Sequence, residues 1–164
     1  MTSAGRKISV HTVESYLSAL TDCFILFQIG RYDVKGRQYL KTGDKYYVVD
    51  IGLRYALLGS RNVDMGHILE NIVYLELVRL GYEVHIGKVG NTEVDFVAIG
   101  DEGEEYYQVA YSVIDADGAT LKRELTPLEA IRDHNPKYLL TMDNTPLVSH
   151  NGIKQINALD WLLK

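Results

Sequence analysis

Two acidic residues and one amide occupy positions from which they could act together on a substrate. Glu70 lies in the apolar segment "GHILENIVYLELVRLG", and Asp95 and Gln108 interrupt the apolar runs "EVDFVAI" and "YYQVAYSV". Burying such a polar group costs about 1 to 3 kcal/mol unless it is compensated. Metal-dependent hydrolysis of a phosphodiester uses carboxylates that converge on one divalent cation. Glu70, Asp95 and Gln108 are therefore candidate residues for a site of this kind.

Each of these residues also has an ordinary structural interpretation. Glu70 lies at the margin of an apolar helical arc, where a surface acid near the helix N-terminus is favourable. Asp95 points away from Val94 and Phe96 if the strand alternates strictly, which places it on a solvated face. Gln108 could form a cross-strand hydrogen bond to Asp95 or to a backbone group. Both interpretations stay open at the level of the sequence.

The elements that would carry these residues follow in the order α-β-β-β-α-β. The segment 66–81 predicts an amphipathic helix that ends at Gly81, with its buried stripe at Leu69, Ile72, Val73, Leu77 and Leu80. Three strands are expected in "YEVHIGK", "EVDFVAI" and "YYQVAYSV", then a helix over 120–134 and a strand in "KYLLTM". A last strand, "IKQI", and a short helix, "ALDWLLK", follow. This pattern predicts an α/β fold with a mixed central sheet flanked by helices.

Residues 1–60 predict a smaller unit. Ser9 can cap a short amphipathic helix, and the runs "FILFQI", "RYDV" and "KYYVVD" predict two or three antiparallel strands before a helix over 51–58. A helix followed by a hairpin with a basic tip is the pattern of a partial winged-helix-like segment. The polar run "GSRNVDM", residues 59–65, predicts a boundary, so we expect domains at 1–60 and 61–164.

The charge is distributed unevenly between these two parts. Residues 1–60 hold 8 Lys and Arg against 5 Asp and Glu, whereas residues 61–164 hold 9 against 17. The first part is therefore the better candidate for contact with DNA phosphates. Its basic tip comprises Arg31, Lys35, Arg37, Lys41 and Lys45, and we interpret the first four as nucleic-acid-binding residues. The alternative is that the hairpin docks onto another protein domain.

Several functional classes are excluded or disfavoured by composition. No apolar run approaches the roughly 18 to 20 residues of a membrane span, so we expect a protein with no membrane partner. The single cysteine, Cys23, forms no internal disulfide, which fits a cytoplasmic location. The chain contains no GxxxxGK[ST] motif, so it cannot itself hydrolyse ATP by the P-loop route.

The element order, with one acid in the first helix and one on the second strand, resembles the restriction-endonuclease-like, PD-(D/E)XK fold. The resemblance implies that Glu70 is the helix acid and Asp95 the central acid, both candidate ligands for Mg²⁺, and that Gln108 completes a residual catalytic site. The (D/E)xK element of that fold aligns with Gln108, Val109 and Ala110. A neutral amide therefore replaces the acid, and alanine replaces the lysine. This departure predicts weaker metal binding and weaker activation of water. Lys122 and Arg123 could supply the missing cation, although Arg123 and Glu124 would otherwise form a surface ion pair.

A broader resemblance covers nearly the whole chain. Blocks such as "GHILENIVYLELVRLGYEV", "EVDFVAIG", "YYQVAYSV" and "PKYLLTMD" are similar to the C-terminal region of prokaryotic AAA+ type ATP-binding proteins. The resemblance implies an N-terminal ATPase domain as a partner that is absent from this chain. It also implies a degenerate nuclease-fold module that binds nucleic acid or a protein partner rather than cutting.

Two alternatives remain at this level. In the first, the chain is an active Mg²⁺-dependent DNA nuclease in which the carbonyl of Gln108 completes the ligand set of Glu70 and Asp95. In the second, it is a protein-interaction module of a defence or toxin-antitoxin-like system. Salt-dependent DNA binding would favour the nucleic-acid interpretations over the last one.

Overall fold

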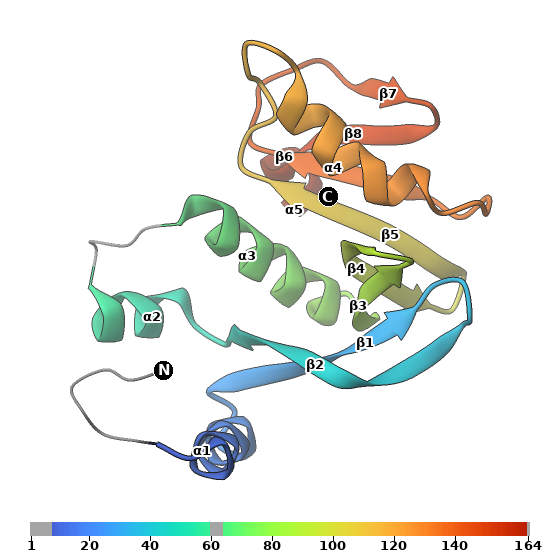
Figure 1. Cartoon of the computed structure of the whole chain (residues 1–164). Helices are drawn as coiled ribbons and strands as arrows, with labels where there is room; N and C mark the ends of the chain where they lie inside the picture. Colours follow the sequence, from blue (N-terminus) through green and yellow to red (C-terminus); the bar gives the residue numbers. More distant parts are fainter. Residues whose placement is uncertain (1–7, 60–63, 164) are drawn as a thin grey trace.

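Eight strands form one mixed sheet in the computed structural model, which describes residues 8–59 and 64–163 (Figure 1). The strand order is β2-β1-β3-β4-β5-β6-β8-β7. The strands are β1 Leu26–Asp33, β2 Gln38–Val48, β3 Glu83–Val89, β4 Thr92–Gly100, β5 Gly103–Ala110, β6 Lys137–Thr141, β7 Val148–His150 and β8 Ile153–Asn157. The helices are α1 Val10–Asp22, α2 Ile51–Leu58, α3 Met65–Arg79, α4 Ala119–Glu129 and α5 Ala158–Leu162.

The sheet combines four antiparallel and three parallel strand pairs. The pairs β1/β2, β3/β4, β4/β5 and β7/β8 are antiparallel. The pairs β1/β3, β5/β6 and β6/β8 are parallel. The predicted mixed sheet is confirmed, and elements α3, β3, β4, β5, α4 and β6 follow in the predicted order.

The N-terminal hairpin is part of the central sheet. Strand β1 pairs in parallel with β3 through Arg31 and Ile86, Tyr32 and Gly87, and Asp33 and Lys88. The runs "FILFQI" and "RYDV" form one strand, because Gly30 lies within a register shift rather than ending the strand. The boundary expected near residue 60 falls on residues 60–63, which lie outside the described residues.

The two faces of the sheet carry separate apolar clusters. On β5, Tyr107 and Val109 belong to one cluster, and the alternate residues Tyr106 and Ala110 belong to the other. Helices α3 and α5 contribute to the first cluster, and α4 contributes to the second. Helix α4 therefore covers the face opposite to α3.

Helix α4 is shorter than the sequence pattern predicts. It ends at Glu129 rather than near residue 134. The amide of Ile131 bonds to the carbonyl of Leu128, which tightens the last turn. Asp133 then leaves the helical path, because its carboxylate pairs with Lys137. Strand β7, which the sequence did not predict, is also present and pairs with β8.

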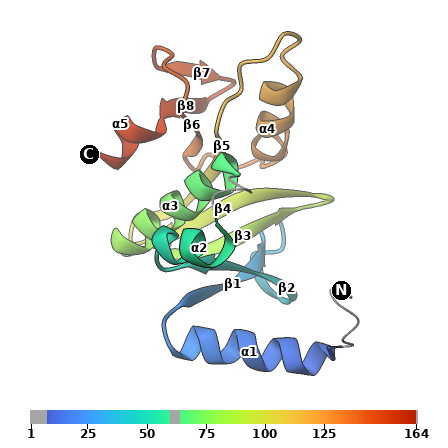
Figure 2. The same cartoon turned by 90° about the vertical axis from the view of Figure 1, so that its left-hand side faces the viewer.

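Helix α1 forms as predicted but buries no residue. The side chain of Ser9 caps it by accepting from the amide of Thr12. Its predicted apolar stripe remains exposed, with Tyr16 67% accessible and Val13 46% accessible. Figure 2 shows α1 apart from the sheet. No helix within residues 8–59 and 64–163 is long and apolar enough to cross a membrane.

We predict that Gly87→Ala destabilises the fold. A Cβ atom at Gly87 would lie 2.7 Å from Cγ2 of Val97 and 3.3 Å from Cβ of Val94, and both valines are fully buried. Overpacking of this kind costs about 1 to 3 kcal/mol. The control is Gly30→Ala, whose Cβ would meet only Asp44 Oδ1 at 4.0 Å. Urea unfolding of both variants checks the prediction, and equal stabilities would contradict it.

Candidate functional site

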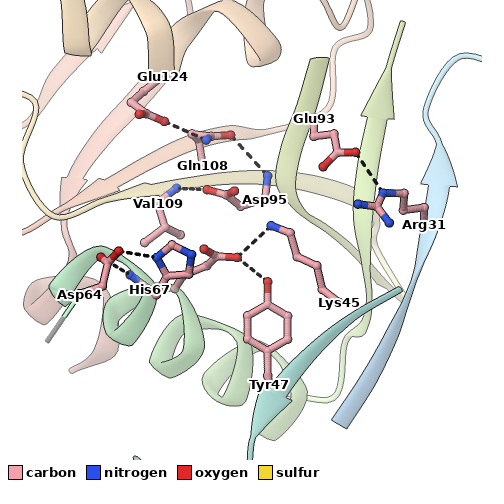
Figure 3. Close-up of polar contacts among 11 residues, drawn as sticks. Arg31, Lys45, Tyr47, Asp64, His67, Glu93, Asp95, Gln108, Val109 and Glu124 are labelled. Atoms are coloured by element: carbon pink, nitrogen blue, oxygen red, sulfur yellow. Dashed lines mark hydrogen bonds and ion pairs between the residues drawn. The ribbon is translucent and has the colours of Figure 1, made fainter. Parts of the chain in front are cut away.

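The three predicted site residues line one pocket. This acidic pocket has a volume of about 430 Å³ and lies between the first turns of α3, the adjoining ends of β4 and β5, and the start of α4. Glu70, Asp95 and Gln108 all contribute to its wall. Figure 3 shows Asp95 and Gln108 side by side, with Glu124 beyond Gln108. Its other charged or ionisable lining residues are Asp64, His67, Arg123 and Glu124. The structure therefore brings the predicted residues together.

Asp95 and Gln108 bridge the point where strands β4 and β5 separate. The backbone pairing of these strands extends from Gly100 and Gly103 to Phe96 and Tyr107. One residue further along, the amide of Asp95 donates to Gln108 Oε1 at 3.3 Å. The amide of Val109 donates to Asp95 Oδ2 at 2.9 Å. These reciprocal contacts satisfy both backbone amides, so the cross-strand interpretation of Gln108 is confirmed.

The other end of the Gln108 side chain contacts α4. Its Nε2 donates to Glu124 Oε2 at 2.9 Å. Glu124 also pairs with Arg123 at 2.7 Å, with only 12% of the glutamate side chain exposed. The sequence interpretation overlooked Glu124 as a pocket residue. Its spacing from Leu121 and Leu128 would have placed it on the buried face of α4.

Glu70 is held by two residues of β2. Its Oε1 accepts from Lys45 Nζ at 3.2 Å and also from the hydroxyl of Tyr47. Lys45 and Tyr47 are alternate residues of one strand, so both side chains point towards α3. Lys45 was expected at the basic tip of the hairpin. It instead contributes a cation to the acidic site, because β2 passes alongside α3.

Burial governs the ionisation of Asp95. Desolvation, and after it the nearby charge of Glu70, raise the pKa of Asp95 to about 7. The hydrogen bond from Val109 and the charge of Lys45 act in the opposite direction. Burial and the neighbouring Glu70 also raise the pKa of Tyr47, so its hydroxyl remains a donor at neutral pH. The environment of Asp95 therefore favours its neutral form.

The charges of the acidic pocket are balanced by residues of the chain. Glu70 pairs with Lys45, and Glu124 pairs with Arg123. At the rim, Asp64 contacts His67 at 2.9 Å. Asp95 has no cationic partner at ion-pair distance within the described residues, and its raised pKa reduces its charge instead.

The arrangement does not fit the Mg²⁺ ion that the resemblance implies. Mg²⁺ requires several oxygen ligands that are free to converge on it. Here Oε1 of Glu70, Oδ2 of Asp95 and Oε1 of Gln108 already accept hydrogen bonds from the chain. In the part of the chain that the structure describes, no group of three or more His, Cys, Asp or Glu residues could hold a metal ion.

The predicted nucleic-acid-binding residues are divided between two environments. Arg31 Nε pairs with Glu93 Oε1 at 3.0 Å, and only 20% of the arginine side chain is exposed. Arg31 therefore forms an ion pair within the sheet. Lys35, Arg37 and Lys41 are exposed at the hairpin. Of the two cations expected to replace the motif lysine, Arg123 lines the acidic pocket, whereas Lys122 is not among its lining residues.

Asn71 fastens α3 to β2 and thereby positions Glu70. Its Oδ1 accepts from the amide of Val48 and its Nδ2 donates to the carbonyl of Val48, each at 2.9 Å. We predict that Asn71→Ala lowers the free energy of unfolding by about 1 to 3 kcal/mol, because two partly buried backbone groups of Val48 lose their partner. Urea unfolding measures this change. Asn91→Ala, at an exposed turn, is the control, and similar effects of both substitutions would contradict the positioning role.

Comparison with known proteins shows relatives without an assigned function. Residues 1–64 match a family described as "Domain of unknown function (DUF8612)". The chain is 36% identical over 164 residues to an uncharacterized protein of Haemophilus influenzae. It is 33% identical over 163 residues to an uncharacterized protein of Methanocaldococcus jannaschii.

These relatives are much longer than this chain. All of the chain aligns with the first, over 40% of that protein's length. The alignment with the second covers 94% of the chain and 34% of that protein. The chain thus spans less than half the length of both relatives. No solved structure matches it.

Proposed function

We propose that this chain is a restriction-endonuclease-like domain that binds nucleic acid without cleaving it and that acts as the C-terminal part of a cytoplasmic AAA+ type ATPase. The order α3-β3-β4-β5-α4-β6 supports the restriction-endonuclease-like assignment. The convergence of Glu70, Asp95 and Gln108 on one pocket supports it further. Residues 1–60 would be the winged-helix-like segment that precedes this domain.

The internal charge balance of the acidic pocket is the observation that carries this proposal. A metal-dependent nuclease leaves carboxylates uncompensated so that they can hold cations. In this chain Lys45 and Arg123 already neutralise Glu70 and Glu124, and the raised pKa of Asp95 favours its neutral form. The pocket is thus stable without a metal, which supports a binding role rather than a cutting one.

The exposed cations of the hairpin support nucleic acid as the ligand. Lys35, Arg37 and Lys41 project from a chain whose net charge is −5, so they form a local basic surface rather than part of a general one. Cations arranged in this way contact phosphates and release counterions, which makes the affinity depend strongly on salt.

The proposed function can be tested by measuring DNA binding and DNA cleavage in parallel. Fluorescence anisotropy with labelled single-stranded and duplex DNA should show affinity that falls steeply as salt increases. Incubation of the same substrates with Mg²⁺ or Mn²⁺ should yield no cleavage. Metal-dependent cleavage that disappears in Asp95→Ala would overturn the proposal in favour of an active nuclease.

Helix α1 supports a second candidate function, a protein-interaction role. Its apolar side chains are exposed, and the relatives contain much additional polypeptide. The occupant that we propose for this face is the ATPase part of the longer protein. Because Val13 and Tyr16 are exposed, serine at both positions should leave stability nearly unchanged and should abolish a salt-insensitive association with that part. Unchanged association in the variant would exclude α1 as the contact.

A further inference from the structure

A second pocket lies at the opposite end of α4 from the acidic pocket. It has a volume of about 660 Å³ and is formed by the turn after β1 and the segment at the end of α4. Figure 1 shows the tip of the β1–β2 hairpin beside the C-terminal end of α4. We call it the basic pocket, because Lys35, Arg37 and Arg132 line it. Arg132 was not part of the basic surface expected from the sequence.

The two acidic residues of the basic pocket are engaged with other parts of the chain. Asp133 accepts from the hydroxyl of Tyr106 at 2.7 Å and pairs with Lys137 at 3.0 Å. Glu129 accepts from Asn151 Nδ2 at 3.0 Å. Since Lys137 offsets the charge of Asp133, Glu129 is the lining acid that opposes the cations of the pocket. Asp33, beside the lining, accepts from the amide of Lys35 at 3.1 Å.

The three cations have no ion-pair partner in residues 8–59 and 64–163. Lys35, Arg37 and Arg132 are all exposed, and none of the ion pairs among the described residues includes them. They come from two segments almost 100 residues apart and meet only through the tertiary structure. Like charges gathered around a concave surface raise the local concentration of anions.

We propose that the basic pocket binds the phosphate group of a phosphorylated ligand. Two guanidinium groups suit this role, because each can form two parallel hydrogen bonds to phosphate oxygens. The volume of about 660 Å³ exceeds what one phosphate needs and falls within the usual range of ligand sites. The ligand is therefore a nucleic-acid backbone or a free nucleotide, which share this chemistry.

This inference extends the proposed nucleic-acid binding to a defined set of residues. Binding of a nucleic-acid backbone in the basic pocket rests on the proposed function, whereas binding of a phosphate group there does not. It also separates the two ends of α4: the acidic pocket contains balanced charges, and the basic pocket presents unpaired cations. A nucleic acid bound by this chain thus contacts the hairpin and the end of α4 rather than the hairpin alone.

The test compares pyrophosphate and DNA binding by four forms of the chain. Calorimetric titration measures pyrophosphate, and fluorescence anisotropy measures labelled DNA. The forms are the original chain, Arg132→Gln, the double variant Lys35→Gln with Arg132→Gln, and the control Lys154→Gln. Lys154 is exposed on β8 and does not line the basic pocket. Because all of these residues are exposed, thermal unfolding should be similar in the four forms.

We expect Arg132→Gln to weaken pyrophosphate binding at least fivefold and the double variant to lose this binding. The affinity of Lys154→Gln for pyrophosphate should stay within twofold of that of the original chain. The inference is wrong if Lys154→Gln and Arg132→Gln lose the same affinity for pyrophosphate, or if the original chain does not bind pyrophosphate. If the ligand is a nucleic-acid backbone, the slope of log DNA affinity against log salt concentration should also become less steep by about 1 for each removed cation.

The DNA measurements separate the inference from the proposed function. Pyrophosphate binding that requires Arg132, without any DNA binding, would support a free nucleotide as ligand and would refute the proposed nucleic-acid role. If the double variant binds both DNA and pyrophosphate as the original chain does, the proposed function stands. The proposal that the basic pocket binds phosphate is then wrong.

Discussion

Asp95→Asn is expected to stabilise the chain at pH 8 and to change its stability little at pH 4. Burial raises the pKa of Asp95 to about 7 in the folded chain, against about 3.9 when unfolded. The folded state thus binds more protons than the unfolded state between these values, and the stability of the original chain falls as pH rises from about 4 to 7. Asparagine removes this ionisation and can still accept from the amide of Val109.

The expected gain at pH 8 is about 2 to 4 kcal/mol, because three pKa units correspond to about 4 kcal/mol and the amide is itself buried. Urea unfolding of the original chain and of Asp95→Asn, measured at intervals from pH 4 to 8, yields the difference directly. Titrating groups that do not interact with Asp95 contribute equally to both proteins, so the difference reports Asp95 together with its interaction with Glu70. If the two stability curves run parallel over this range, Asp95 is ionised normally and the pocket is more polar than the structure indicates.

Asp95→Ala is the matched control for the hydrogen bond. Alanine also removes the charge, but it leaves the amide of Val109 without its acceptor at the point where β4 and β5 separate. This loss costs about 1 to 3 kcal/mol. We therefore expect Asp95→Ala to be less stable than Asp95→Asn at every pH, and the reverse order would exclude the bridging role.

The second large effect is expected for Gln108→Glu, which restores the acid that the PD-(D/E)XK resemblance leads one to expect. Gln108 Nε2 donates to Glu124, so a carboxylate in its place would meet the Glu124 carboxylate without a proton between them, although its other oxygen could still accept from the amide of Asp95. Like charges at this distance oppose ionisation strongly. At pH 8 without metal, we expect the free energy of unfolding to fall by about 2 to 4 kcal/mol.

Divalent metal should reverse this loss. A carboxylate at position 108 would join those of Glu70, Asp95 and Glu124 in one pocket. Mg²⁺ or Mn²⁺ can neutralise this added charge, and a ligand that binds only the folded state stabilises it. We expect the melting temperature of Gln108→Glu to rise with added metal and that of the original chain to remain constant. A metal response of the original chain as large as that of the variant would show that Gln108 does not determine metal binding.

Gln108→Leu distinguishes the effect of the added charge on stability from the effect of the lost hydrogen bonds. Leucine removes both contacts of the Gln108 side chain but adds no carboxylate. It should destabilise the chain by about 2 to 3 kcal/mol, with no response to Mg²⁺ or Mn²⁺. Rescue of the leucine variant by metal would assign the response to another site.

Lys45 shows why the acidic pocket depends on the first 60 residues. The pocket is lined by residues from 64 onwards, yet the cation that pairs with Glu70 comes from β2. Strand β2 reaches α3 because β1 joins β3 in the sheet and because Asn71 fastens the end of β2. Residues 61–164 alone would therefore lack the counter-charge of Glu70.

Local pattern was sufficient for the order of the central elements and for Asp95 and Gln108, whereas Glu70 was selected through the fold resemblance. The spacing of apolar residues predicted α3 and strands β3, β4 and β5, and Asp95 and Gln108 stood out because each interrupts an apolar strand. Their place on neighbouring strands then made it reasonable to expect them in one pocket. Glu124 could also have been recognised, since its helical spacing from two leucines marks a buried position.

The remaining features were decided only by the tertiary structure. The pairing of β1 with β3, the contact of Lys45 with Glu70, and the meeting of Arg132 with Lys35 join segments that are distant along the chain. Local periodicity indicates which face of an element is apolar, but it does not indicate which other element covers that face. The sequence by itself thus determined most of the strands and helices and the positions of Asp95 and Gln108. Packing of the whole sheet determined which cations balance those acids and which remain available for a ligand.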